Sequence, residues 1–348
     1  MNLKNKKVLL VGLAKTGVST IKHLNRLGAK VVVNDIKDKD KLKDILDELS
    51  DLNNVEYILG HHPENIDDID MTVVSPGVPL DLPFILKIKS KNIEIIGEVE
   101  LAYRLSKNPI FIGITGTNGK TTTTSLVGEI FKKANRDTYI VGNIGNPVID
   151  TVDLTNKDSV LVTELSSFQL ESIDTFRPKV SAFLNITEDH LNRHYNMENY
   201  VFLKSKLLKN LSEAEYAILN YDDEIVRNFF RKTKAHCIYF SVRERVDGAY
   251  YQDGALYFYD EKIIEERQLA TGGIHNVQNA LCAIICAKLM GVKTQTIGKA
   301  LSQFRGIKHR VQFVGEIDGV KYVDDSKGTN VDATMKAVNS LKGNIVLL

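Results

Sequence analysis

A glycine-rich segment between a strand and a helix constrains this chain more than any other feature. The predicted strand Pro109–Thr115 runs into GTNGKTT at 116–122, and a helix is expected over about 120–135. Glycines let backbone N–H groups curl around an anion, and the helix N-terminus adds the positive end of its dipole. Lys120 can neutralise phosphate charge, and the Thr121 hydroxyl can bind Mg²⁺. The segment therefore predicts a nucleotide-phosphate loop.

The spacing inside this loop departs from the usual pattern in one place. A strict Walker A sequence has a glycine five positions before Gly119, where this chain has Ile114. The loop is therefore the shorter G-x-x-G-K-T that starts at Gly116. The alternative is an ordinary glycine-rich turn that carries Gly-Lys-Thr by chance. The context, after a buried strand and before a helix, favours the phosphate loop.

The composition limits the class of protein. A length of 348 residues predicts two or three domains. The 45 basic and 44 acidic residues give a formal net charge of +1, which argues against a dedicated nucleic-acid binder. No apolar run reaches about 18 residues, so neither a membrane-spanning helix nor a membrane partner is expected. The three cysteines cannot form a disulfide framework, which favours a reducing, cytoplasmic setting. Cys282 and Cys286 lie in an apolar helix and are predicted to be core residues.

The first hundred residues alternate strand-like and helix-like segments. Lys7–Val11, Lys30–Asn34 and Met71–Ser75 have the composition of buried strands, and Gly17–Leu27 that of a helix. Short apolar runs between helices are typical of βαβ units with a parallel sheet. We therefore predict an α/β fold that begins with a Rossmann-like N-terminal domain over residues 1–106.

A second α/β unit follows, with the phosphate loop near its start. Ser159–Thr163 and Val180–Asn185 continue the strand pattern, and Asp253-Gly254 between aromatic flanks indicates a hairpin. We predict that residues 107–307 form a central P-loop-type mononucleotide-binding ATPase domain with an added antiparallel patch.

The residues after 307 differ in composition from those before them. Val311–Val314 and Val320–Val323 flank Asp318-Gly319, a pair that favours a tight turn. Asn344–Leu348 is apolar and is predicted to start a buried strand. A strand without a neighbour leaves an unpaired edge. Residues 308–348 are therefore predicted to be the beginning of a third Rossmann-like domain that is truncated.

Two polar side chains follow strands of the second unit. Glu164 comes directly after Ser159–Thr163, and His190 follows Val180–Asn185. Ligands of open α/β sheets bind at the carboxyl ends of the strands. Glu164 is thus placed to hold Mg²⁺, although a solvated glutamate is an equal alternative. We expect His190 to bind metal or phosphate, and its alternative is a structural histidine.

Lys204 lies on an apolar helical stripe. It shares one predicted helical face with Tyr200, Leu207 and Leu211, whereas Lys206 falls off that face. A lysine on such a stripe usually extends its amine to water, and the spacing alone favours this interpretation. The alternative is a lysine held in a site, where desolvation lowers the pKa of the amine. Such an amine can add CO₂ and become a carboxylate-like metal ligand.

A second glycine turn opens the first helix of the chain. In GLAKTG at 12–17, Ala14 replaces the middle glycine of the dinucleotide pattern and hinders close approach to a pyrophosphate. The helix N-terminus still favours an anion. Asp35 ends the next strand, where an acid can contact a ribose or a base. The segment fits a nucleotide-linked ligand better than NAD, and the turns at 75–78 and 142–147 are plain loops by default.

Polar residues also gather in later segments. Asn276 is a reasonable N-cap for a helix over 277–290, and its amide, with that of Asn279, can reach a purine. Arg310 suits a phosphate. The loop Asp324–Asn330 combines charged and small residues, which suggests a binding site. Solvated polar residues are the alternative for both.

Taken together, these motifs resemble those of the Mur ligase family. The ordered series spans essentially the whole chain: GLAKTG, SPGVP, GITGTNGKTTT, GNIGNP, ELSSFQLE, NITEDHLNRH, the helix with Lys204, GIHNVQNA, HR and DDSKGTN. The GLAKTG opening, SPGVP and GEVEL point to the branch of the family that adds D-glutamate. Ala14 stands where the family often has glycine, and Asn192 where it often has aspartate.

The resemblance implies an ATP-dependent ligase that forms an amide bond through an acyl phosphate, with ATP and Mg²⁺ as cofactors. Thr121 and Glu164 would hold a first Mg²⁺, and His190 with a carbamylated Lys204 a second. The catalytic residues would be Lys120, Lys204, His190 and Lys327. The ATP-binding residues would be Gly116, Thr117, Asn118, Gly119, Lys120, Thr121, Thr122, Asn276, Asn279, Arg310 and Asp325.

The resemblance also implies two further substrates, UDP-N-acetylmuramoyl-L-alanine and D-glutamate, and a role in peptidoglycan precursor synthesis in the cytoplasm. A monomer is expected. Because the family's C-terminal domain normally continues further, this chain is expected to bind the UDP substrate but to be inactive as a ligase. The residues that would bind the UDP substrate are Lys15, Thr16, Asp35, Ser75, Gly77, Asn143 and His190.

Three alternatives remain open at this point. The closest is a sibling Mur ligase that adds another amino acid, or a folylpolyglutamate-synthase-like enzyme. A different class is a nucleotide-gated binding protein that uses the phosphate loop as a switch. The third is an NAD(P) oxidoreductase, against which Ala14 argues.

Overall fold

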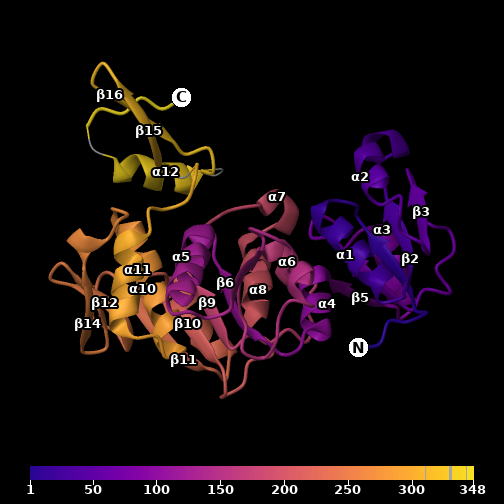
Figure 1. The fold of residues 1–348 in the computed structure, drawn as a ribbon, viewed down its shortest axis with the longest axis horizontal. Coiled ribbons are helices and arrows are strands. Elements are labelled where there is room, and N and C mark those ends of the chain that lie inside the picture. The colour runs from indigo at the N-terminus through magenta and orange to yellow at the C-terminus, as the bar shows by residue number, and fades with distance from the viewer. Residues whose placement is uncertain (310, 329–330, 342) are drawn as a thin grey trace. The chain divides into compact units, whose positions relative to one another are not determined.

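The computed structural model describes residues 1–309, 311–328, 331–341 and 343–348. Contacts along the backbone divide the chain into two compact units, both of them α/β (Figure 1). The first unit comprises residues 1–109, 141–158 and 165–177, and the second comprises 110–140, 159–164 and 178–348. The division into domains at 1–106, 107–307 and 308–348 stays a prediction.

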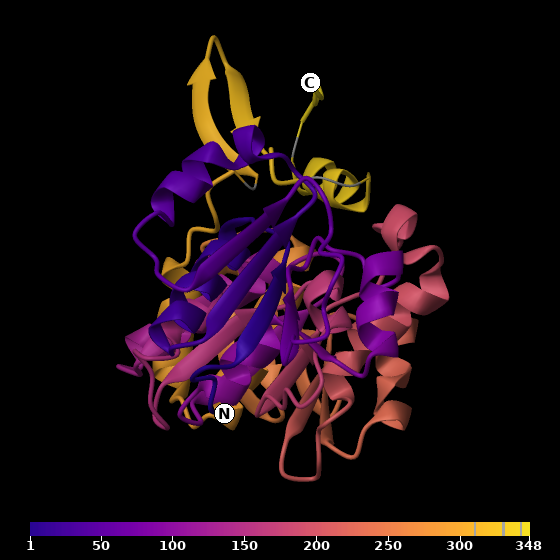
Figure 2. The same ribbon diagram turned by 90° about the vertical axis from the view of Figure 1, so that its right-hand side faces the viewer.

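The first unit is built on a five-stranded parallel sheet. The strand order is β3-β2-β1-β4-β5, and Figure 2 shows these strands side by side in indigo and purple. This arrangement confirms the parallel sheet that the strand–helix alternation predicted. The elements are β1 (Lys7–Val11), α1 (Lys15–Arg26), β2 (Lys30–Asp35), η1 (Lys39–Leu42), α2 (Lys43–Glu48), β3 (Val55–Leu59), β4 (Met71–Val74), α3 (Pro83–Ser90), β5 (Glu94–Gly97), α4 (Glu98–Leu105), η2 (Val148–Thr151) and α6 (Ser167–Glu171), where η marks a 3₁₀ helix.

The core of the first unit explains its apolar strands. Leu9, Val32 and Val74 project from the sheet onto Ile85 and Ile88 of α3, and all five are buried. Helices cover such parallel strands, which therefore need apolar side chains along their whole length. Burying each of these side chains contributes roughly 1.5–3 kcal/mol.

The second unit contains a nine-stranded sheet in the order β14-β13-β12-β11-β10-β9-β6-β8-β7. The pairs β12–β13 and β13–β14 are antiparallel, and this confirms the hairpin predicted at Asp253-Gly254. The elements up to residue 308 are β6 (Ile110–Thr115), α5 (Lys120–Lys133), β7 (Thr138–Gly142), β8 (Val160–Glu164), β9 (Val180–Phe183), α7 (Leu191–His194), α8 (Met197–Ser205), η3 (Lys206–Leu208), β10 (Tyr216–Asn220), α9 (Glu224–Arg227), η4 (Asn228–Lys232), β11 (His236–Ser241), β12 (Gly248–Gln252), β13 (Ala255–Phe258), β14 (Glu261–Glu265), η5 (Glu266–Gln268), α10 (Ile274–Leu289) and α11 (Thr294–Gln303).

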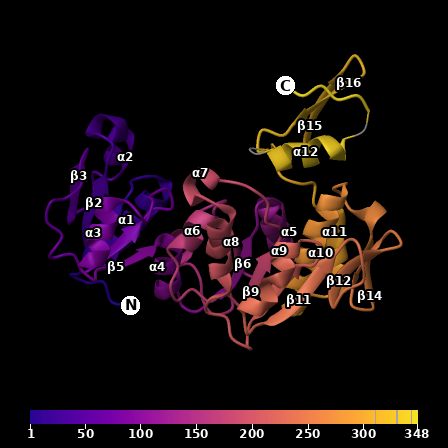
Figure 3. The same cartoon turned by 180° about the vertical axis from the view of Figure 1, so that it is seen from behind.

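Helix α5 forms despite a run of poor helix formers. The threonines at 121–124 are β-branched, which disfavours a helix. The helix packs against α10, α11 and β8, and Figures 1 and 3 show α10 and α11 beside it. Tertiary packing thus outweighs local propensity here. Cys282 and Cys286 of α10 are fully buried in this core, as predicted.

The residues after 308 form a hairpin and a helix. The antiparallel pair β15 (Gln312–Ile317) and β16 (Val320–Asp324) confirms the turn predicted at Asp318-Gly319, and α12 (Val331–Ser340) follows. The strand predicted at Asn344–Leu348 is wrong, because these residues are exposed and have no strand conformation. None of the described residues pairs with them, and a strand needs a hydrogen-bonded neighbour.

The start of α10 also differs from the prediction. The helix begins at Ile274, so Gly273 is its N-cap and Asn276 lies within the first turn. The Asn276 amide donates to the Gly272 carbonyl at 2.7 Å instead of capping the helix. Gly273 has φ +92°, a conformation that glycine adopts without strain, and this lets the helix begin three residues earlier than predicted.

In the part of the chain that the structure describes, no helix is long and apolar enough to cross a membrane.

Candidate functional site

The phosphate loop lies in the second unit, between β6 and α5. Gly119 is the N-cap of α5 and has φ +84°, a left-handed conformation that glycine adopts without strain. A Cβ at Gly119 would lie 2.5 Å from Oδ1 of Asn279, so a side chain has no room there. Both the backbone conformation and the close approach of α10 therefore require glycine at position 119.

Asn185 holds the loop in place. The backbone N–H of Thr117 donates to the Asn185 carbonyl, and the N–H of Asn118 donates to the Asn185 side chain, each at 2.8 Å. The Asn185 amide returns a hydrogen bond to the Asn118 carbonyl at 3.0 Å. Asn185 was not among the predicted site residues, although its place after β9, at the strand ends, was a usable signal.

Lys120 folds back over the loop. Its Nζ donates to the carbonyls of Gly116 at 3.0 Å and Thr117 at 2.8 Å. An ammonium held there stands at the N-terminus of α5, where the helix dipole also attracts anions. The arrangement suits a nucleotide phosphate, whose oxygens are stronger acceptors than backbone carbonyls.

Lys204 is buried directly behind the same loop. Its side chain is 1% exposed, and its Nζ donates to the Gly116 carbonyl at 2.8 Å. The Nζ also lies 4.8 Å from the centre of the Tyr200 ring. Tyr200, Leu207 and Leu211 are buried with it, which confirms the predicted apolar face. The interpretation that the amine extends to water is wrong, because the loop supplies an acceptor inside the protein.

The surroundings of Lys204 favour the neutral form of its amine. Burial, followed by the positive charge of Lys120, holds the pKa of the Lys204 amine well below its usual range. The carboxylates of Asp189 and Glu164 act in the opposite direction. A lysine with a lowered pKa has a larger fraction of neutral, nucleophilic amine.

The residues predicted to bind metal are only partly gathered. Glu164 is 1% exposed at the end of β8, in register with Ile114 just before the loop, and Thr121 lies in the first turn of α5. His190 is exposed, and its Nε2 lies 3.6 Å from Oδ2 of Asp189. Among the described residues, no three His, Cys, Asp or Glu side chains form a group suited to a metal. Phosphate and water oxygens would complete a Mg²⁺ site here.

Two buried rings support the loop from α7 and α8. The Tyr200 hydroxyl and the Thr117 hydroxyl lie 3.1 Å apart within hydrogen-bond reach, and the Tyr200 ring stacks on His194 at 5.3 Å. Burial, followed by Arg193 and His190, lowers the pKa of His194 to about 4. His194 therefore stays neutral near pH 7. His194 was not among the residues predicted from the sequence.

The remaining residues predicted to bind ATP are more scattered. Asn279 is buried and accepts from the Thr123 hydroxyl at 3.1 Å, next to the loop. Thr122 is buried in α5, and Asp325 accepts from the backbone N–H of Val311 at 3.0 Å. Lys327 is exposed. Arg310 lies outside the described residues.

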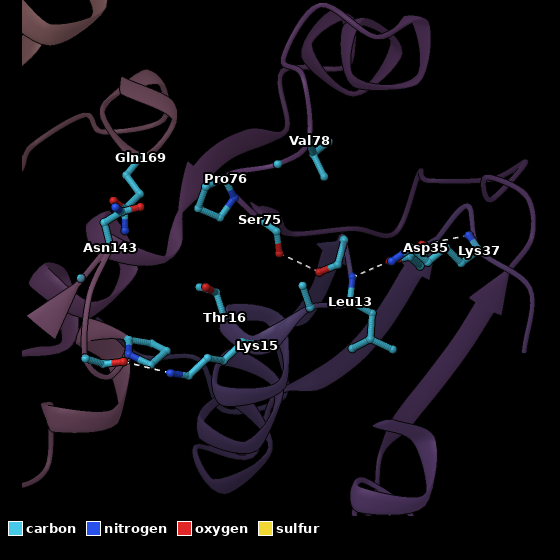
Figure 4. A pocket seen from close by; sticks show the side chains of 16 residues that line it. Leu13, Lys15, Thr16, Asp35, Lys37, Ser75, Pro76, Val78, Asn143 and Gln169 are labelled. Atoms are coloured by element: carbon cyan, nitrogen blue, oxygen red, sulfur yellow. Dashed lines mark hydrogen bonds between the residues drawn. The ribbon is translucent and has the colours of Figure 1, made fainter. Parts of the chain in front are cut away.

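A cavity of about 480 Å³ lies in the first unit. Figure 4 shows it between the start of α1 and the segments that carry Asn143 and Gln169. The Lys15 ammonium donates to the Gly145 carbonyl at 2.9 Å, across one side of the cavity. On the other side, Asp35 accepts from the backbone N–H of Leu13 at 2.7 Å, which ties the end of β2 to the turn before α1.

The chemistry of the cavity suits an anionic, nucleotide-linked ligand. Lys15 and Lys37 supply positive charge, and the start of α1 lines the cavity, where a helix N-terminus favours an anion. Ser75 is held by a hydrogen bond of 2.6 Å from its hydroxyl to the Gly12 carbonyl. A Cβ at Gly12 would meet Ser75 at 2.9 Å, so this turn requires glycine.

The cavity gathers most of the residues predicted for the UDP substrate. All of them except His190 line it, and His190 belongs to the second unit. The segment 142–147, a plain loop by default, forms one wall. Sequence reasoning missed Lys37 and Gln169. Gln169 lies in the ELSSFQLE motif, but only the fold shows that α6 faces this cavity.

Comparisons with known proteins agree with this geometry. The Mur ligase middle domain matches residues 114–287, and the Mur ligase MurD-like N-terminal domain matches residues 6–97. The UDP-N-acetylmuramoylalanine--D-glutamate ligase of Clostridioides difficile (strain 630) is 59% identical over 352 residues, which cover all of this chain and 78% of that protein. The protein of the same name from Alkaliphilus metalliredigens (strain QYMF) is 48% identical, with the same coverage.

Solved structures share the fold at lower identity. MurF from Acinetobacter baumannii superposes with a TM-score of 0.62 at 18% identity, covering 97% of this chain and 69% of that chain. UDP-N-acetylmuramate-alanine ligase MurC from Thermotoga maritima gives a TM-score of 0.59 at 20% identity, covering 96% and 77%. These likenesses confirm the predicted fold class.

The fold, the phosphate loop and these relatives define an ATP-dependent ligase that forms amide bonds. The chain belongs to the Mur ligase family.

Proposed function

We propose that this protein joins D-glutamate to UDP-N-acetylmuramoyl-L-alanine at the expense of ATP, as a cytoplasmic monomer in peptidoglycan precursor synthesis. The observation that carries the proposal is the phosphate loop, where the amines of Lys120 and Lys204 meet at the Gly116 carbonyl. The choice of substrates is supported by relatives of that printed name, 59% and 48% identical across the whole chain.

The proposed reaction has two steps. A carboxylate oxygen of the UDP substrate attacks the γ-phosphorus of ATP, so that a C–O–P linkage forms and ADP leaves with the electron pair of the broken P–O bond. The amine of D-glutamate then attacks the acyl carbon of the acyl phosphate. The amide nitrogen loses a proton, and inorganic phosphate leaves. Both steps need positioning and charge stabilisation more than covalent help from the protein.

Lys120 is the residue we assign to the transferring phosphate. Its ammonium already lies against the loop carbonyls, at 2.8 and 3.0 Å, so a phosphate oxygen needs only to replace a weaker acceptor. The backbone of Gly116–Gly119 and the side chains of Thr121 and Thr122 complete the phosphate-binding group. We assign Asn276 and Asn279 to the base, Arg310 and Asp325 to further contacts with ATP, and Lys327 to a catalytic position beside the reacting centre.

Mg²⁺ would offset the charge that develops on the transferring phosphate. Glu164 and Thr121 fit as its ligands, because a buried carboxylate and a hydroxyl flank the loop. Lys204 fits after carbamylation, since burial lowers the pKa of its amine and CO₂ adds to neutral amines. His190 is assigned to the same group, although its side chain is exposed.

The cavity of the first unit is assigned to the UDP substrate. Lys15 and the first turn of α1 would meet the diphosphate, and Asp35 would meet the ribose or base. Ser75, Gly77, Thr16 and Asn143 form its walls. NAD is disfavoured, because Ala14 caps α1 where a dinucleotide needs the closest backbone approach.

The test is ADP release with the UDP substrate and a panel of amino acids, measured on the protein as its gene encodes it. D-Glutamate should give the highest kcat/KM. A preference for another amino acid would assign the chain to a sibling ligase. Slow hydrolysis that is indifferent to every acceptor would instead support a nucleotide-gated binding protein.

A further inference from the structure

Glu98 is a buried carboxyl that the proposed reaction does not use. It is the first residue of α4, and its side chain is 3% exposed. Its Oε1 accepts a hydrogen bond of 2.6 Å from the backbone N–H of Ile149, in η2. Its Oε2 has no hydrogen-bond partner among the described residues. Burying such a group opposes folding, so stability alone does not explain it.

The segment that Glu98 holds leads directly into the cavity of the first unit. The loop 142–147 precedes η2, and its residues Gly142, Asn143, Gly145 and Pro147 form part of the cavity wall. The Gly142 N–H donates to the Asn146 carbonyl at 3.0 Å and closes the loop. Lys15 holds the middle of the loop at Gly145, and Glu98 holds η2, the helix that follows the loop.

We propose that Glu98 is a positioning residue for the UDP-substrate cavity. Its carboxylate holds the N-terminus of η2, fixes the loop that carries Asn143, and makes ligand affinity depend on whether the carboxyl is ionised. The inference rests on the proposed function of this cavity.

The physical basis is the strength of one hydrogen bond. An ionised carboxylate accepts from a backbone N–H about twice as strongly as a neutral acid does. Compared with a state in which η2 has moved away while Glu98 stays buried, the ordered loop therefore stabilises the ionised form, and the ionised form stabilises the ordered loop. Because this coupling is reciprocal, a ligand that needs the ordered loop binds better when Glu98 is ionised.

The surroundings place the ionisation of Glu98 near neutrality. Burial, opposed by the N–H groups of Ile149 and Val148 and reinforced by the negative charge of Asp150, raises the pKa of Glu98 to about 7. Asp150 lies on η2 and accepts from the Ser19 hydroxyl at 3.1 Å. Affinity should therefore rise with pH between about 6 and 8.

Other charged groups lie on the elements that pack against α4 and η2. On α1, which packs against η2, His23 and Arg26 face Asp153. Burial, followed by the positive charge of Arg26, lowers the pKa of His23 from its usual value, while Asp153 and Asp150 act in the opposite direction. On β5, Glu94 pairs with Arg104 at 2.7 Å, and β4 carries no charged residue.

Glu100, two residues further along α4, provides an internal contrast. It is also buried, but it accepts from Arg104 and from the backbone N–H groups of Asp174, Thr175 and Phe176. These partners outweigh burial, and the pKa of Glu100 is lowered. Glu100 remains ionised at neutral pH, so it does not produce a step in that window.

The experiment measures the Kd of UDP-N-acetylmuramoyl-L-alanine for the 348-residue chain from pH 6 to 8.5, with ATP as a second ligand. We expect the wild-type chain to bind the UDP substrate about fivefold more tightly at pH 8.5 than at pH 6. Glu98→Gln should bind at the low-pH affinity throughout, with no step. ATP affinity should be the same in both chains at each pH.

Two further variants move the step without removing Glu98. Asp150→Asn removes the nearby negative charge and should shift the midpoint to lower pH. Asp153→Asn makes the same charge change beside Arg26 and should leave the midpoint unchanged. These two variants keep the test sharp even if Glu98→Gln does not fold.

The outcomes separate this inference from the proposed function. A flat pH profile in the wild-type chain, a step that survives in Glu98→Gln, or a midpoint that Asp150→Asn does not move would overturn the role of Glu98 and leave the substrate assignment intact. Absence of binding at every pH would overturn the substrate assignment, and the role of Glu98 with it.

Discussion

Burial shifts the pKa of a lysine at the phosphate loop of the second unit and of a glutamate near the cavity of the first unit. Behind the loop, desolvation lowers the pKa of a lysine, Lys204. Beside the cavity, desolvation raises the pKa of a glutamate, Glu98, to about 7. In both places the neutral form gains at the expense of the charged form.

The difference between them lies in what each group does. Lys204 touches the loop itself, at the Gly116 carbonyl, and under the proposed function its amine would serve the chemistry at the phosphates. Glu98 touches a backbone N–H of η2, one element away from the cavity wall. On the two proposals made above, burial produces a reactive group where the side chain contacts the phosphate loop, and a positioning group where it contacts an element behind the cavity wall.

The largest effect is expected at Lys120. Lys120→Met removes the ammonium from the loop and should lower the rate of ADP release by about 10³-fold, because the charge on the transferring phosphate loses its fixed partner. Steady-state ADP release by the protein as its gene encodes it measures this. Lys132→Met, on the exposed face of the same helix, is the matched control and should behave as wild type. Equal losses in both variants would contradict the assignment.

Glu98 should also leave a signature in stability. Its carboxyl has a folded pKa of about 7 and an ordinary value of 4.5, so the folded chain binds more protons than the unfolded chain between these values. Stability from this group therefore falls as pH rises from about 4.5 to 7, by at most about 3 kcal/mol. This fall in stability with rising pH is opposite to the expected rise in ligand affinity, because burial on folding favours the neutral carboxyl whereas the hydrogen bond to η2 favours the ionised one. Denaturant unfolding at several pH values should show the slope in wild type and lose it in Glu98→Gln; parallel curves would argue against the raised pKa.

A smaller loss is expected at Lys204. Lys204→Met keeps the apolar stem but removes the amine, and ADP release should fall roughly 100-fold. Removing dissolved CO₂ should also lower the activity of the wild-type protein, and bicarbonate should restore it. Lys206→Met, off the buried face, serves as control. If CO₂ removal has no effect while Lys204→Met is inactive, the lysine acts as an amine and carbamylation is wrong.

The smallest effect is expected at the cavity. Lys15→Met removes one charge and the hydrogen bond to Gly145, and the Kd for the UDP substrate should rise about tenfold. ATP affinity should not change, because ATP is assigned to the other unit. Lys22→Met lies further along α1 in an exposed ion pair with Glu48 and should bind normally. Calorimetric titration of each ligand distinguishes the two effects.

The elements around the phosphate loop were readable from the sequence because their signals are local. The strand before the loop, the glycines and the helix that starts at Lys120 are all encoded within about twenty residues, and the structure places them within a residue or two of the prediction. The same holds for the hairpin at Asp253-Gly254. The predicted strand at Asn344–Leu348 failed because apolar composition does not supply a neighbouring strand.

The sites were only partly readable, because their members are distant along the chain. The spacing of Lys204 correctly gave its helical face but favoured a solvated amine. The acceptor that retains the amine, the Gly116 carbonyl, lies 88 residues earlier in the sequence. Likewise, Gln169 and Lys37 reach the cavity only because α6 and the end of β2 belong to the same unit.

The amino-acid sequence by itself determined the α/β fold, the phosphate loop and the residues suited to hold phosphate, since periodicity and glycine positions act over short stretches of chain. Only the tertiary structure decided which ionisable groups are desolvated. Burial depends on neighbours from distant segments, and it turned Lys204 inward and left Glu98 with a single hydrogen-bonded oxygen. The charge state of a buried group is therefore a property of the packed fold, even where its identity is plain from the sequence.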